Sequence, residues 1–157
     1  MPKWNRKFLV IFGFIFLIIF ILIGMSKPTQ AARMPECGIR IDDVHFSTSL
    51  ARLGKGRVIK ANAYSHCSQL HKHVRLRVKI RKTGLFWDHT VADVTTNPDE
   101  THMAVFDVKN EKTLAICINN RATNYYALAQ SSAEVNGKTL STEWAHSEHT
   151  VLLQCGT

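Results

Sequence analysis

The chain has 157 residues, of which 45% are hydrophobic and 20% charged, and its 20 Lys and Arg residues face 12 Asp and Glu residues, a net charge of +8. Four of the bases and none of the acids fall in the first 31 residues, so the remaining chain carries a charge of only +4. Because residues 75–82 alone contribute five positive charges, the rest is close to neutral, which excludes a generally basic protein.

The N-terminal segment is predicted to direct export. Residues 1–7 are basic and lack acids, and residues 8–25 are apolar apart from two glycines. This pattern is typical of a secretory leader, and the apolar run is also just long enough to span a bilayer. We expect residues 1–31 to be a signal peptide cleaved after Ala31 or Ala32, with an uncleaved membrane anchor as the alternative. Either way the remainder lies outside the cell or at its surface, because positive charge stays inside.

After a short linker over 32–36, residues 37–157 are predicted to form one domain. About 125 exported residues suffice for a single hydrophobic core. The domain contains Cys37, Cys67, Cys117 and Cys155. An even number of cysteines in an oxidising compartment predicts two disulfides.

The hydrophobic pattern of the domain has a period of two, which indicates β-strands. Short turn signals separate the alternating runs, most clearly at Asn136-Gly137. The predicted strands cover 39–44, 58–64, 73–82, 85–94, 102–108, 113–118, 123–135 and 138–153. Residues 109–112 are expected to form a hairpin turn, and the alanine-rich segment 125–135 would also suit a helix. Seven or eight short strands must pack sheet on sheet, so we predict an all-β, immunoglobulin-like β-sandwich.

The Asn136-Gly137 hairpin helps to choose among the three possible disulfide connectivities. Counted outward from this two-residue turn, Cys117 and Cys155 are one position away from standing directly opposite each other. A single bulge would bring them together. Cys37 and Cys67 flank the preceding Gly-Lys-Gly turn in a similar way. We therefore favour two bridges that each close the open end of an antiparallel pair.

The alternative connectivity is that of antibody domains, with Cys67–Cys117 joining two sheets and Cys37–Cys155 closing the chain. Two observations count against it. The alternating apolar residues of 114–118 predict a core face from which Cys117 points away, and the residues before Cys117 lack the antibody motif.

The cysteine positions and one strand together resemble a known group of proteins. Cys37 near the exported N-terminus, Cys67, an alternating basic strand at 74–81, a late Cys117 and a terminal Cys155 are similar to small exported β-sandwich proteins of actinobacteria, mostly uncharacterised. The resemblance extends from Cys37 to Cys155 through loose motifs. It implies export and a fold, and it implies no activity.

The clearest functional signal is the strand over 73–82, where cations alternate with apolar residues. The cations predicted to bind anions are Arg75, Arg77, Lys79 and Arg81. Side chains on one strand face repeat about every 6.6 Å, so the four form a stripe of roughly 20–25 Å that attracts polyanions. The candidate partners are an anionic cell-wall polymer, lipid headgroups or an acidic protein. Nucleic acid is disfavoured because no aromatic residue interleaves the stripe.

The alternative for this strand is a solvated sheet face whose cations pair with acids on neighbouring strands. The candidate acids are Asp88, Asp93, Asp107 and Glu111. Cations would also protect an edge strand from pairing with another sheet. The sequence leaves open whether the strand is central or at an edge.

The histidines are weaker candidates for a metal site. His66, His71 and His73 cluster before the basic strand, and His146 and His149 lie near the C-terminus. No carboxylate stands at a metal-site spacing and the neighbouring residues are cationic, so we predict surface histidines and no metal or cofactor. In mild acid they would add charge to the stripe.

The sequence contains no recognised catalytic motif, and its cysteines are expected to be oxidised, so we predict a protein that is not an enzyme. Trp87 is expected in the core, with Phe86 facing outward. The leading hypothesis is an exported, non-enzymatic binding module at or beyond the cell surface. A structural subunit of a cell-envelope assembly that pairs through an edge strand, and a secreted hydrolase or toxin, are the alternatives.

Overall fold

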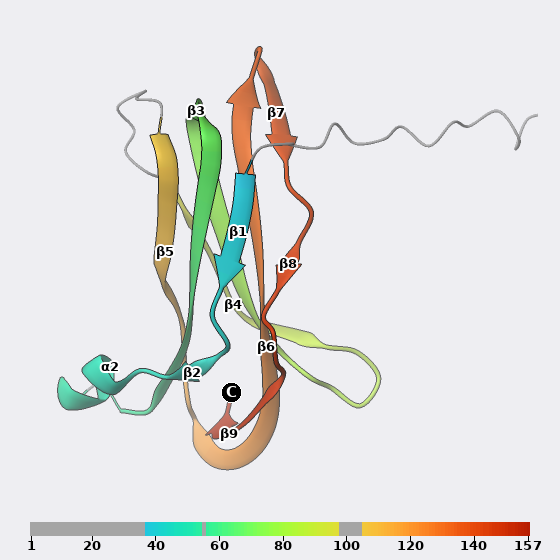
Figure 1. Cartoon of the computed structure of the whole chain (residues 1–157). Helices are drawn as coiled ribbons and strands as arrows, with labels where there is room; N and C mark the ends of the chain where they lie inside the picture. Colours follow the sequence, from blue (N-terminus) through green and yellow to red (C-terminus); the bar gives the residue numbers. More distant parts are fainter. Residues whose placement is uncertain (1–36, 55, 98–104) are drawn as a thin grey trace, which may run out of the picture. The chain divides into compact units, whose positions relative to one another are not determined.

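The computed structural model describes residues 37–54, 56–97 and 105–157, and the predicted leader and linker lie outside them (Figure 1). The elements are β1 (Cys37–Ile41), β2 (His45–Phe46), α2 (Thr48–Arg52), β3 (Val58–Lys82), β4 (His89–Thr96), β5 (Val105–Ile116), β6 (Asn119–Val135), β7 (Lys138–Ser141), β8 (Ala145–His146) and β9 (Val151–Gly156). The prediction of a chain made mostly of β-strands is confirmed.

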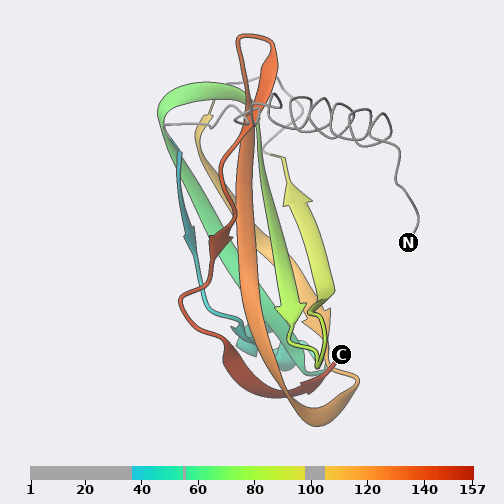
Figure 2. The ribbon, with the colours of Figure 1, turned by 90° about the vertical axis from the view of Figure 1, so that its right-hand side faces the viewer.

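The long strand β3 joins two halves of the sheet. Residues 58–71 pair with β1, β2 and β5, and residues 72–82 pair with β4 on one side and β6 on the other. The chain folds over between these parts, near His73, whose φ is +52° (Figure 2). We call the two parts the first and the second half-sheet. The predicted strands 58–64 and 73–82 are therefore two arms of one bent strand.

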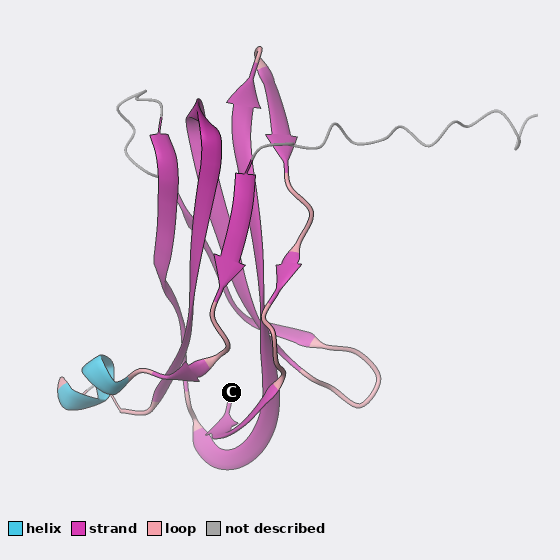
Figure 3. Ribbon diagram, in the orientation of Figure 1, coloured by secondary structure: helices cyan, strands magenta, loops and turns pink. Residues whose placement is uncertain are grey.

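The second half-sheet continues beyond β6, which pairs in turn with β7, β8 and β9. Residues 125–135 belong to β6, so the helical alternative for this segment is wrong. The short α2 is the single helix of the described residues, and the sequence did not predict it (Figure 3). No helix in these described ranges is long and apolar enough to cross a membrane.

The core lies between the inward faces of the two half-sheets. In the first arm of β3 the odd-numbered residues from 59 to 67 are buried, among them Ile59, Ala61 and Ala63. The second arm buries its even-numbered residues, and β6 adds alternate alanines. Residues Ala32–Thr157 are one compact unit that contains this core and both disulfides. A unit with its own core is expected to fold by itself.

A bulge in β5 corrects two predictions. Ala61 pairs with Thr113 while Ala63 pairs with Asn110, so β5 carries one more residue than β3 between the two pairs. The strand runs through 109–112, and the predicted hairpin there is wrong. Beyond the bulge Thr113 and Ala115 are buried, which leaves Leu114, Ile116 and Ile118 exposed rather than in the predicted core face.

The cysteines form the two bridges that the hairpin interpretation favours. Cys37 and Cys67 are bonded and directly opposed between β1 and β3. Cys117, in the connection from β5 to β6, is bonded to Cys155 in β9. Among the described residues no cysteine is free.

The hairpin turn at Asn136-Gly137 has φ values of +51° and +72°, the left-handed conformation that this dipeptide was expected to adopt. Val135 pairs with Lys138 next to the turn. Further along, Tyr125 pairs with Val151. Val151 lies three residues beyond the residue with which Tyr125 would pair if the hairpin continued without interruption. The register therefore slips by more than the single bulge that the sequence predicted.

Candidate anion-binding face

The predicted anion-binding residues lie on the outer face of the second half-sheet. They alternate with Val74, Leu76, Val78 and Ile80, which are buried in the core. The second arm of β3 runs between β4 and β6, so the strand is central. Arg75, Arg77, Lys79 and Arg81 form what we call the basic stripe. Because the strand is central, these cations do not protect a sheet edge.

Asp93 on β4 forms ion pairs with the two middle cations of the basic stripe. The guanidinium of Arg77 donates to both carboxylate oxygens, from Nε to Oδ1 at 2.8 Å and from Nη2 to Oδ2 at 2.6 Å. The Nζ of Lys79 lies 3.7 Å from Oδ2 of the same carboxylate. The hydrogen bond from Arg77 lowers the pKa of Asp93. Of the four acids proposed as partners, Asp93 is the one whose carboxylate forms ion pairs with the stripe in the described residues.

Arg81 stabilises the turn between β3 and β4. Its Nη2 donates to the backbone oxygen of Asp88 at 2.7 Å. The carboxylate of Asp88 accepts hydrogen bonds from the hydroxyl of Tyr126 at 2.7 Å and from the backbone nitrogen of Gly84 at 3.3 Å. These bonds lower the pKa of Asp88, that from Tyr126 most strongly. Arg81 is half-buried and contributes more to this turn than to a free surface.

Arg75 is the most available cation of the basic stripe. It is exposed, and its side chain has no hydrogen bond or ion pair within the described part of the chain. It lines a shallow hollow of about 250 Å³ with Ser132, Glu134 and Thr139. The guanidinium and the hydroxyl groups of Ser132 and Thr139 suit an anionic group, whereas the carboxylate of Glu134, which lies 3.6 Å from Nε2 of His73, opposes one.

Aromatic side chains flank the basic stripe, although none interleaves it along the strand. The Nζ of Lys79 lies 4.8 Å from the ring centroid of Trp144. The rings of Tyr126 and His146 stack with their centroids 6.1 Å apart, and Tyr126 pairs with Arg81 across the strands. These neighbours were not predicted from the sequence, because they come from β6, from β8 and from the residue before β8. Alternation along β6 indicates that Tyr126 faces outward, but only the pairing of β6 with β3 places it beside the stripe.

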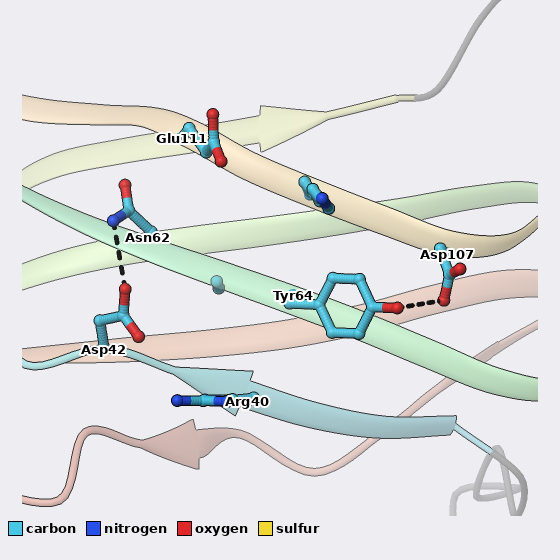
Figure 4. A pocket seen from close by; sticks show the side chains of 8 residues that line it. Arg40, Asp42, Asn62, Tyr64, Asp107 and Glu111 are labelled. Carbon is cyan, nitrogen blue, oxygen red and sulfur yellow. Dashed lines mark hydrogen bonds between the residues drawn. The ribbon is translucent and has the colours of Figure 1, made fainter.

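Asp107 and Glu111, the other proposed partners of the stripe, lie on the outer face of the first half-sheet (Figure 4). With six other residues they line a shallow hollow of about 440 Å³. Oδ1 of Asp107 accepts a hydrogen bond from the hydroxyl of Tyr64 at 2.6 Å and lies 2.6 Å from Nδ1 of His66. Since the bond to Asp107 raises the pKa of Tyr64, this hydroxyl is a poorer nucleophile at neutral pH than an ordinary tyrosine.

Three of the histidines singled out from the sequence have different partners. His66 contacts Asp107, His146 stacks on Tyr126, and His149 binds Asp43. Within the described residues the one three-residue group with metal-ligand geometry is His71 with Cys37 and Cys67, whose ligand atoms lie within 4.8 Å of one another. Both sulfurs are bonded to each other, so neither can act as a thiolate ligand.

The expected core position of Trp87 is wrong. The side chain lies in the turn between β3 and β4 and is 67% exposed. Tyr125 is the aromatic residue of the core instead, and its hydroxyl donates to the backbone oxygen of Cys155. Phe86 faces solvent, as predicted.

Comparison of the chain with models of protein families and with curated proteins finds no significant match.

Proposed function

We propose that this protein is an exported, non-enzymatic binding module of immunoglobulin-like β-sandwich type, which holds an anionic polymer of the cell surface on its basic stripe. The observation that carries the proposal is the central position of the stripe, with all four cations directed away from the core. A leader-like N-terminus and two disulfides support the export of this domain. The resemblance to small exported actinobacterial proteins agrees with it.

The shape and chemistry of the face favour a polymer over a small molecule. Small ligands are usually held in enclosed, mostly apolar pockets, whereas the hollow beside Arg75 is shallow and polar. The basic stripe follows one strand, so it can contact successive anionic groups of an extended chain. Trp144 and Tyr126 add flat apolar surface beside the cations, which suits sugar or alkyl segments between the charges.

The four cations of the basic stripe are not equally available to such a ligand. Arg75 is free to bind, Arg77 and Lys79 share the single negative charge of Asp93, and Arg81 is engaged by the turn. We therefore expect Arg75 to contribute most of the affinity, and Arg77, whose side chain is 48% exposed against 20% for Lys79, to contribute more than Lys79. Because these contacts are electrostatic, retention on a polyanion must fall steeply with salt.

The test is the retention of the disulfide-bonded domain, residues 32–157, on a column of an anionic polymer through a salt gradient. A variant with Arg75→Ser and Arg77→Ser is compared with one carrying Arg40→Ser and Lys109→Ser, which loses the same charge from the outer face of the first half-sheet. We expect early elution of the stripe variant alone. Equal elution of both variants would show that only net charge matters and would refute the proposal.

A further inference from the structure

A second surface lies at one end of the domain, where α2, the turn between β3 and β4, the connection from β5 to β6 and the end of β9 are found (Figure 1). Hydrogen bonds join these segments: the backbone nitrogen of Cys117 donates to the oxygen of Arg57 at 2.9 Å, and that of Ile118 donates to the oxygen of Gly156 at 2.7 Å. We call this surface the apolar end.

Large apolar side chains are unusually exposed here. Leu85, Phe86 and Trp87 form the tip of the turn between β3 and β4, with 91%, 83% and 67% of their surface accessible. Ile116 at the end of β5 and Ile118 in the neighbouring connection are 64% and 80% exposed. Ordinary surfaces scatter such residues singly, and a cluster of them indicates a surface that another phase or molecule covers.

The space between the turn and the connection is also apolar. Val91 at the start of β4 and Leu114, Ile116 and Ile118 line a hollow of about 660 Å³, together with Lys82 and His89. Phe86 and Trp87 lie with their ring centroids 6.0 Å apart. The apolar end thus presents a protruding aromatic tip beside an open apolar hollow with a basic rim.

The charge of the segments at the apolar end is mostly positive. The described residues of 47–57, 82–88, 117–123 and 151–157 include four Lys or Arg residues and one acid. The cations are Arg52, Arg57, Lys82 and Arg121. The acid is Asp88, whose carboxylate already accepts hydrogen bonds from Tyr126 and Gly84. The apolar end therefore complements a surface that is negative outside and apolar within.

We propose that the apolar end docks on a lipid bilayer with anionic headgroups. The tip of Leu85, Phe86 and Trp87 inserts among the headgroups and upper acyl chains, where tryptophan is favoured, while the cations contact lipid phosphates. A second copy of the chain fits less well, since a two-fold interface would bring the same cations face to face. This inference goes beyond the proposed function, because it uses another surface and another ligand.

The experiment uses the domain over 32–157 with vesicles of phosphatidylcholine, alone or mixed with phosphatidylglycerol. Co-sedimentation measures binding, and quenching by brominated lipid reports insertion, with the signal of Trp87 obtained by subtracting a Trp87→Phe variant. Binding is expected with the mixed vesicles. A Phe86→Ser, Trp87→Ser variant should partition at least about tenfold more weakly, because burial of each of these side chains contributes a factor of this order.

A Leu70→Ser, Phe106→Ser variant is the matched control, since it removes two exposed apolar side chains that lie outside the apolar end. It should bind mixed vesicles like the parent protein. Equal binding of the parent and the Phe86→Ser, Trp87→Ser variant to vesicles would overturn the inference. So would a parent protein that binds no vesicles but forms a dimer, if the Phe86→Ser, Trp87→Ser variant is a monomer. If vesicle binding is lost instead with Arg75→Ser and Arg77→Ser, the basic stripe is the lipid contact and the apolar end is not.

Discussion

The side-chain amide of Asn110 on β5 donates a hydrogen bond of 3.2 Å to the backbone oxygen of Leu76, which lies in the opposite half-sheet. The same nitrogen donates to the oxygen of Val94 at 3.0 Å. Its Oδ1 accepts from the backbone nitrogen of Lys112 and the hydroxyl of Thr113. Asn110 is fully buried, so one polar side chain both holds the bulge of β5 and links the two half-sheets.

Replacing Asn110 with alanine should therefore destabilise the domain strongly. Two backbone oxygens and the hydroxyl of Thr113 would lose partners away from water, which costs about 3 kcal/mol in the free energy of unfolding. Chemical denaturation of the parent and variant measures this difference. The exposed Asn124→Ala is the control and should change stability by no more than about 0.5 kcal/mol. Similar small effects of both variants would mean that Asn110 is not a structural link.

Replacing Asp93 with asparagine should strengthen the binding of polyanions. The change removes the carboxylate that engages Arg77 and Lys79, so both cations become available on the basic stripe. Elution from an anionic polymer should move to higher salt. Asp42→Asn makes the same change of charge on the outer face of the first half-sheet and should have a smaller effect. An equal shift for both variants would argue against a localised site.

The pair of His149 and Asp43 predicts a window of pH in which it stabilises the fold. Nδ1 of His149 lies 2.7 Å from Oδ2 of Asp43, whose Oδ1 accepts from the backbone nitrogen of His149 at 2.8 Å. The carboxylate raises the pKa of His149 above its ordinary 6.5, so this contribution is complete below about pH 6.5 and is lost as the pH rises through the raised pKa. The backbone and side-chain bonds from His149 lower the pKa of Asp43 below 3.8. The stabilising contribution of Asp43 is therefore present above about pH 3.8 and is lost as the pH falls through the lowered pKa.

The difference in melting temperature between the parent and a His149→Ala variant should consequently be largest near about pH 5 and shrink as the pH rises through the raised pKa of His149. In a background of Asp43→Asn the pH dependence of this difference should become much smaller, because only the weaker attraction of Glu148 still acts on the imidazolium. A difference that stays constant from pH 5 to pH 8 would show that the pair contributes no charge-dependent stability.

Removing either disulfide should cost a similar amount of stability. The bridges close loops of 30 and 38 residues by sequence separation, for which loop entropy gives about 3–4 kcal/mol each as an upper guide. Urea unfolding of the Cys37→Ser, Cys67→Ser variant and of the Cys117→Ser, Cys155→Ser variant measures both. If one pair proves dispensable while the other is essential, native contacts rather than loop length decide their effect.

Local patterns in the sequence were enough for several features of this fold. The period of two predicted strands, and the burial of alternate residues such as Ile59 and Leu76 follows it because strand side chains alternate between faces. Asn136-Gly137 marked a hairpin, since both positions need positive φ. The cysteine pairing was also predicted correctly, although the register between β6 and β9 slips by more than the single bulge on which that prediction rested.

Tertiary structure alone decided the features that depend on which strands are neighbours. The bulge at Asn110 exists because that side chain reaches oxygens on other strands, and one extra residue reverses every face beyond it, which is why the expected core position of Ile116 is wrong. The partnership of Asp93 with Arg77 and the place of Trp144 beside Lys79 follow from cross-strand register. The sequence by itself determined the alternation along each strand, because that is a local property of the backbone, whereas neighbours across the sheet are set only when the whole chain packs.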